Sequence, residues 1–156
     1  MICAFTGHRP EHLPWGRDED DPRCRALKIL LRRTVQQVYD RGFRTFLCGM
    51  ARGCDQYFAE AVLACRAAGT APEAILTAMV PCPSQKDGWP AEEQARYDAL
   101  LAACSAVEVL EPVYTPGCLL RRAQLLISVY DGTPGGTAAT VRLAEELGIT
   151  VLPLWM

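Results

Sequence analysis

Short, continuous apolar runs alternate along this chain with longer segments whose apolar residues recur at helical spacing. The runs cover residues 2–6, 43–48, 74–80, 106–110, 125–130 and 149–154. The helical pattern covers residues 23–41, 55–68, 90–104 and 137–147. Alternating strands and helices favour a mainly parallel sheet, and continuous apolar strands are expected when helices cover both faces. We therefore predict a three-layer α/β architecture.

The length and the connections fit a single domain of this kind. The chain has 156 residues, and no repeat, linker or low-complexity tract divides it. The difficult connection joins the fourth and fifth strands, because it contains Pro112 and Pro116 and is little longer than the dozen or so residues that a parallel crossover needs. We predict one Rossmann-like α/β domain over residues 1–156.

Composition favours a cytoplasmic protein with reduced thiols. The net charge is −2, no apolar run approaches the roughly 20 residues of a membrane span, and the N-terminal residues carry no basic leader. The eight cysteines stand singly, without a CxxC pair. A metal site built from Cys48, Cys54, Cys82 and His8 is disfavoured, because the spacing matches no zinc pattern.

The loops that follow the predicted strands hold the candidate ligand-binding residues. Open parallel sheets bind ligands beyond the carboxyl ends of their strands. Four loops supply the candidates, which are Gly7, His8 and Arg9 after the first strand; Gly49, Arg52, Gly53 and Asp55 after the second; Gln85 after the third; and Asp131, Gly132, Gly135, Gly136 and Thr137 after the fifth. We expect these loops to meet around one cleft.

The segment Gly135-Gly136-Thr137 is the best individual candidate for a phosphate site. Two glycines let the backbone approach a ligand closely and adopt φ values that other residues avoid. Thr137 is expected to cap a helix whose free N–H groups attract an anion. The alternative is a tight turn with an ordinary cap. The segment is neither a Walker A loop nor a GxGxxG fingerprint.

Each polar candidate also has a structural interpretation. Asp55 could accept hydrogen bonds from a ribose or cap its helix. Arg9 could bind a phosphate or remain a solvated arginine, and His8 could be a structural histidine. Asp131 could bind a ribose hydroxyl or a metal, or begin a turn, and Gln85 could read a base. The acidic run 18–21 and the basic residues of helix 23–41 are expected to be solvated.

Taken together, four motifs resemble the YpsA-like branch of the SLOG superfamily. They are TGHRP at 6–10, GxxxGxD at 49–55 with Ala-Glu at 59–60, PxxxQ at 81–85 and YDGxxGGT at 130–137. The superfamily also contains LOG phosphoribohydrolases, DprA/Smf DNA-processing proteins and molybdenum-cofactor carriers. The resemblance extends over nearly the whole chain. It implies a Rossmann-like sheet and a site for a nucleotide or ADP-ribose-like ligand, with no settled activity.

Two departures from relatives of this family bear on function. Catalytic LOG proteins resemble one another in a Pro-Gly-Gly-x-Gly-Thr-x-x-Glu loop, whereas here Thr140 stands three residues after Thr137. The missing Glu argues against LOG chemistry. YpsA-like proteins also carry an Arg-Asn pair and further helical turns before the fifth strand. Here Arg121-Arg122 leads almost directly into Ala123, so a more open pocket is expected.

The leading hypothesis is therefore binding or sensing of a nucleotide-derived ligand, with no catalytic residue, metal or further cofactor assigned. One alternative is hydrolysis of an N-glycosidic or phosphate-ester bond, with Asp55, Glu60, Asp131 or His8 as acid or base. Another is single-stranded DNA binding by analogy with DprA, which the charge of −2 and the 8% aromatic content disfavour. The apolar run 151–155 suggests a homodimer.

Overall fold

Within the described residues, 1–110 and 116–155 of a computed structural model, six strands form one parallel sheet. The strands are β1 (Ile2–Gly7), β2 (Thr45–Cys48), β3 (Ile75–Val80), β4 (Ala106–Val109), β5 (Leu125–Val129) and β6 (Thr150–Leu154), in the order β4-β3-β2-β1-β5-β6. Every neighbouring pair is parallel. This confirms the predicted Rossmann-like architecture.

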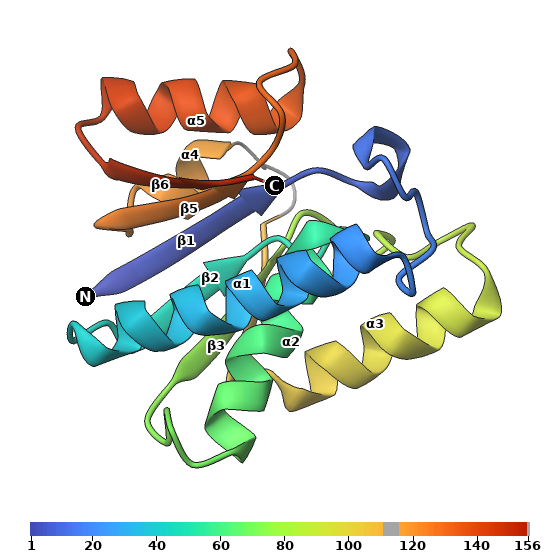
Figure 1. The fold of residues 1–156 in the computed structure, drawn as a ribbon, viewed down its shortest axis with the longest axis horizontal. Helices are drawn as coiled ribbons and strands as arrows, with labels where there is room; N and C mark the ends of the chain where they lie inside the picture. The colour runs from blue at the N-terminus through green and yellow to red at the C-terminus, as the bar shows by residue number, and fades with distance from the viewer. Residues whose placement is uncertain (111–115, 156) are drawn as a thin grey trace.

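Helices cover both faces of the sheet. Helices α1 (Pro22–Asp40), α2 (Cys54–Ala67) and α3 (Ala91–Ala103) lie on one side, and α4 (Pro116–Leu120) and α5 (Gly136–Glu146) lie on the other (Figure 1). Successive side chains of a strand point to opposite faces. Cys3 and Phe5 of β1 accordingly belong to the apolar cluster under α1 and α2, whereas Ala4 belongs to the cluster under α4 and α5.

Helix α1 shows how the apolar stripe positions these layers. Leu27, Leu31, Val35 and Val38 recur every three or four residues and are at most 4% exposed. Burying each such side chain contributes about 1.5–3 kcal/mol before conformational entropy is counted. The Asp21 side chain accepts a hydrogen bond from the Arg23 backbone N–H and caps the helix.

The connection from β4 to β5 creates a reversal of strand order at the centre of the sheet. It returns the chain from the edge strand β4 to a position beside β1, and Leu119 and Leu120 of α4 pack on the face opposite to α1. Pro112 lies outside the described residues. Because the chain leaves β1 toward one side of the sheet and β5 toward the other, their carboxyl ends form a topological switch point, where ligands of such sheets bind.

The described part of the chain contains no helix with the length and hydropathy needed to cross a lipid bilayer.

Candidate functional site

A cavity of about 490 Å³ opens at the carboxyl ends of the central strands. Gly7 and Gly136 both line it, which confirms that the loops after β1, β2, β3 and β5 converge. Nine predicted residues line the cavity, namely Gly7, His8, Arg9, Gly49, Asp55, Gln85, Gly135, Gly136 and Thr137. The other four, Arg52, Gly53, Asp131 and Gly132, are absent from its wall. Thr6, His12, Ala51, Pro81, Pro134 and Thr140 line it without having been predicted.

The N-terminus of α5 faces the cavity without a side-chain cap. Thr137 was expected to be the cap, but the N-cap is Gly135, whose carbonyl accepts the Ala139 N–H at 3.0 Å. Thr137 instead lies in the first helical turn with its side chain buried. The backbone N–H groups of Gly136, Thr137 and Ala138 precede the first intrahelical bond. Among the described residues none of the three has an acceptor.

The two glycines of this loop have different roles. Gly135 has φ +153° and ψ −165°, a conformation that is essentially restricted to glycine. Gly136 has no positive φ, and a Cβ atom added there would meet nothing within 4 Å. The expectation of an unusual φ therefore applies to Gly135, whereas Gly136 provides open space at the helix end.

Thr140 occupies the next turn of α5 and also faces the cavity. Its side chain is buried, and its hydroxyl donates to the Gly136 carbonyl at 3.0 Å. A threonine hydroxyl, unlike the Glu carboxyl of the LOG-like loop, does not ionise near neutral pH. The wall of the cavity at α5 therefore lacks the carboxylate that the LOG-like loop would place there.

Asp55 places a buried carboxyl group in the cavity wall. The N-cap of α2 is Gly53, so the expected capping role of Asp55 is wrong. Its Oδ2 instead accepts the Ala51 backbone N–H at 3.1 Å, and the residue is 9% exposed. Burial raises the pKa of this carboxyl to about 7, against the opposing effects of the Ala51 N–H and the Arg9 charge.

Two predicted glycines hold backbone segments together. The His8 carbonyl accepts the Cys54 N–H at 3.1 Å, where the end of β1 crosses the start of α2. A Cβ atom on Gly7 would lie 2.6 Å from the Cys54 Cβ. One on Gly53, where φ is +89°, would lie 2.8 Å from the His8 carbonyl oxygen. These glycines are required for the close approach of the two loops.

His8 and Asp131 form a structural pair. The buried His8 ring has its Nε2 3.1 Å from the Asp131 Oδ1. The same oxygen accepts the Thr133 hydroxyl at 2.6 Å and the Thr133 backbone N–H at 3.0 Å. The Thr133 bonds, followed by the His8 contact, hold the pKa of Asp131 well below its usual range. Asp131 therefore begins the turn, and Gly132 follows it outside the cavity wall.

Arg9 and His12 supply basic groups at the mouth of the cavity. Arg9 is exposed, and among the described residues no ion pair holds its guanidinium. His12 belongs to a short 3₁₀-helix, Pro10–His12, which follows β1. Pro10 at its first position was the available signal.

Gln85 links the loops after β2 and β3. Its Nε2 donates to the Gly49 carbonyl at 3.0 Å, and its Oε1 accepts the Tyr97 hydroxyl at 2.8 Å. Both ends of the amide are engaged, so these bonds fix its orientation, and the expected role in reading a base would fall to the second N–H of Nε2 or the second lone pair of Oε1.

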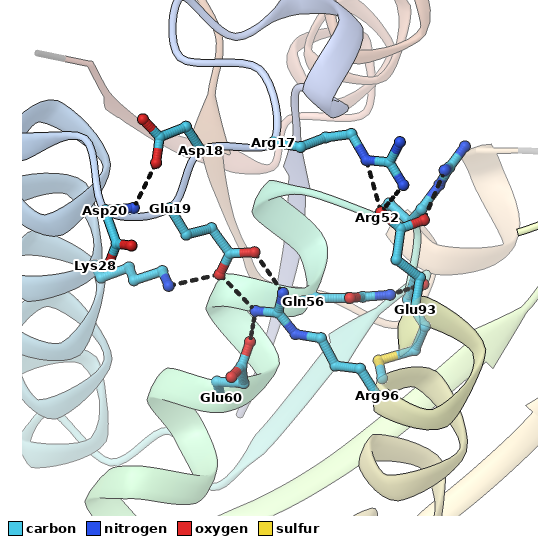
Figure 2. A network of polar contacts seen from close by, with 11 residues as sticks. Arg17, Asp18, Glu19, Asp20, Lys28, Arg52, Gln56, Glu60, Glu93 and Arg96 are labelled. Atoms are coloured by element: carbon cyan, nitrogen blue, oxygen red, sulfur yellow. Dashed lines mark hydrogen bonds and ion pairs between the residues drawn. The ribbon is translucent and has the colours of Figure 1, made fainter. Parts of the chain in front are cut away.

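Arg52 turns away from the cavity into a charged network (Figure 2). Its guanidinium donates to Glu93 of α3 at 2.9 Å, and Arg17 donates to the same carboxylate at 2.7 Å. Glu60, a candidate acid of the hydrolase alternative, pairs with Arg96 in a second cluster of ion pairs and does not line the cavity. The network fastens the loop after β2 to α3.

Glu19 corrects the expectation that residues 18–21 form a solvated loop. Its carboxylate accepts Lys28 at 2.7 Å and Arg96 at 2.5 Å (Figure 2). Although partial burial opposes ionisation, these hydrogen bonds hold the pKa of Glu19 below its usual value. Glu19 therefore anchors the segment before α1 to α3, whereas Asp18 and Asp20 are exposed as expected.

The chain matches the model of a known family. The model of the family YpsA, described as the YspA SLOG family, matches residues 3–133. The match begins in β1 and ends in the turn after β5, so Gly135, Gly136 and α5 lie just beyond it. No curated protein matches the chain.

Proposed function

The chain belongs to the YspA SLOG family, and from this premise we propose that it binds or senses a nucleotide or nucleotide-derived ligand in the cavity at the β1–β5 switch point. The volume of about 490 Å³ falls within the range of small-molecule sites. Nucleotide-related binding or processing is what membership of this family suggests, and the geometry of the cavity favours binding.

The uncapped N-terminus of α5 carries the proposal. Three consecutive backbone N–H groups without acceptors among the described residues, at the positive end of a helix dipole, attract a phosphate group. Arg9 lines the same cavity and adds a full positive charge, which a guanidinium can direct to two phosphate oxygens. We place the phosphate of the ligand at Gly135 and Gly136.

Several features favour binding over catalysis. Thr140 replaces the carboxylate of the LOG-like loop and bonds to its own helix. Asp131 and His8 are engaged with each other, and Glu60 is paired with Arg96 outside the cavity. Of the four proposed acids and bases, Asp55 alone combines a cavity position with a raised pKa.

Titration calorimetry with ADP, ADP-ribose, NAD and the nucleoside monophosphates tests the proposal. We expect at least one to bind, and Arg9→Ala to weaken that binding, more strongly at low salt, because screening is then smallest. Arg142→Ala is the matched control, since Arg142 is an exposed arginine of α5 outside the cavity wall. Failure of the whole panel to bind, or equal weakening by both variants, would contradict the proposal.

One observation favours hydrolysis of an N-glycosidic or phosphate-ester bond as the second candidate. A carboxyl group with a pKa of about 7 is suited to proton transfer at neutral pH. Incubating the same nucleotides with the protein and separating the products by chromatography tests this function. Release of base or phosphate that Asp55→Asn abolishes would establish it, whereas intact nucleotides would leave binding as the function.

We also propose that the protein functions in the cytoplasm. The thiols of Cys3, Cys24, Cys48, Cys54 and Cys65 are buried in the core. Buried thiols of this kind are typical of proteins from a reducing compartment. Fractionation of cells followed by immunodetection tests the assignment, and recovery of the protein outside the cytoplasmic fraction would contradict it.

A further inference from the structure

We propose that Asp55 is the specificity-determining residue of the cavity, where its inward-facing carboxylate oxygen recognises the vicinal hydroxyl pair of a phosphorylated pentose. The inference rests on the proposed function, because it assumes that the phosphate of the same ligand lies at the N-terminus of α5.

The hydrogen bonding of Asp55 is incomplete. Its Oδ2 accepts the Ala51 N–H at 3.1 Å, and among the described residues no donor reaches Oδ1. The side chain is more than nine-tenths buried and yet lines the cavity. Because Oδ1 is not one of the fully buried polar atoms that lack a partner, it is accessible from the cavity, and a ligand hydroxyl can donate to it there.

The charges around Asp55 favour neutral donors with a phosphate further away. From the loop after β1 the Arg9 charge acts on the carboxyl group, and from the end of β2 and the start of α2 the Cys48 and Cys54 thiols face it. His8 and His12 line the same cavity. No cation is paired with Asp55 in the described part of the chain. Hydroxyl groups can therefore donate to the carboxylate without displacing an ion pair.

The strand order places the two ends of the ligand on opposite sides of β1. Asp55 follows β2 and Gly136 follows β5, and β1 lies between these strands. Neighbouring strands are about 4.8 Å apart, so the two strand ends are separated by about 10 Å. Asp55 and Gly136 both lie beyond these ends, at the starts of α2 and α5 on opposite sides of β1, so a phosphorylated pentose would lie across the end of β1. The base of a nucleotide would lie beyond it, which favours the sugar hydroxyls as the partners of Asp55.

Proton binding supplies a second signature of this contact. Burial raises the pKa of Asp55 to about 7 in the unliganded protein. Hydroxyl donors stabilise the ionised carboxylate, so they bind better after its proton has left. The affinity for a ribonucleotide should therefore rise as the pH increases from about 6 to about 8. The ligand phosphate, whose second pKa is about 6, is common to the ribo and deoxy forms, so the ratio of their affinities should rise with pH in the wild type and stay constant in Asp55→Asn.

The test compares AMP and ADP with their 2′-deoxy forms, and AMP with IMP, by calorimetry. We expect wild-type protein to bind the ribonucleotides at least about tenfold more tightly than the deoxy forms, and to bind AMP and IMP alike. Asp55→Asn should lose the preference for ribose and the dependence of that preference on pH. Asp87→Asn, at an exposed position outside the cavity, is the matched control and should retain both.

The outcomes separate this inference from the proposed function. If the wild-type protein binds none of ADP, ADP-ribose, NAD and the nucleoside monophosphates, both the proposed ligand class and the role of Asp55 fail. If it binds the ribo and deoxy forms equally, or Asp55→Asn keeps the preference, the role of Asp55 is wrong and the binding function stands. Discrimination between AMP and IMP that Asp55→Asn abolishes would assign the carboxylate to the base and overturn the inference.

Discussion

Replacing Asp55 by Asn should stabilise the folded protein at alkaline pH. The buried carboxyl has its pKa raised from 3.8 to about 7, mainly by desolvation. Because each pKa unit corresponds to about 1.4 kcal/mol, the ionised side chain destabilises the fold by up to about 4 kcal/mol above pH 7. The Asn side chain can still accept the Ala51 N–H with its amide oxygen, so the loop geometry is retained.

The sign of the pH dependence makes this prediction specific. A carboxyl whose pKa is higher in the folded state contributes favourably below its unfolded pKa, and that contribution is lost as the pH rises through about 7. Urea unfolding of both proteins from about pH 5 to about pH 8 should show a gap in stability that widens with pH. A gap that stays constant, or a wild-type protein that is more stable than Asp55→Asn at pH 8, would refute the reasoning.

Three further predictions follow from the packing of the fold. Gly53→Ala should lower the free energy of unfolding in urea by about 2–4 kcal/mol, because its Cβ would meet the His8 carbonyl oxygen at 2.8 Å. Gly69→Ala, where φ is +77° and nothing lies within 4 Å of the Cβ, should lower it by only about 1 kcal/mol. Equal losses would exclude the steric contact. Burial raises the pKa of the Cys3 thiol to about 12, so Cys3 should resist a thiol reagent in the native protein and react with it in denaturant. Mass spectrometry locates the label, and rapid labelling of Cys3 in the native protein would contradict this prediction. The edge strand β6 and the adjacent Trp155, which is 39% exposed, should pair two copies of the chain; light scattering that shows a monomer at high micromolar concentration would exclude the dimer.

The fold could be predicted because local pattern and global packing agree. In β1, Cys3, Ala4 and Phe5 are all apolar, and each is needed because the faces alternate between the two helical layers. The helices likewise begin and end near proline and glycine signals, as at Pro22 and Gly42. Helix α4 escaped prediction because its five residues are too short to show a helical period.

The candidate site could be placed from the sequence only to the level of loops. Which side chains face the cavity depends on partners distant in sequence, such as Glu93, which draws Arg52 away across 41 positions. Gly7 was predicted as a ligand glycine and lines the cavity, but its close contact with Cys54 could not be predicted from the sequence. His12 lines the cavity because a turn of 3₁₀-helix follows β1. Pro10 was the only sequence signal of that turn. Sequence spacing carries no information on such tertiary contacts.

Calorimetry on Gly136→Ala tests the proposed phosphate site most directly. The added methyl group would meet no protein atom within 4 Å and would occupy the space before the α5 N–H groups. The melting temperature should therefore stay within a few degrees of the wild-type value, while binding of any nucleotide that the wild-type protein binds should be abolished. Gly136→Ala protein that binds such a nucleotide as tightly as the wild type would contradict the assignment of the phosphate to this helix end.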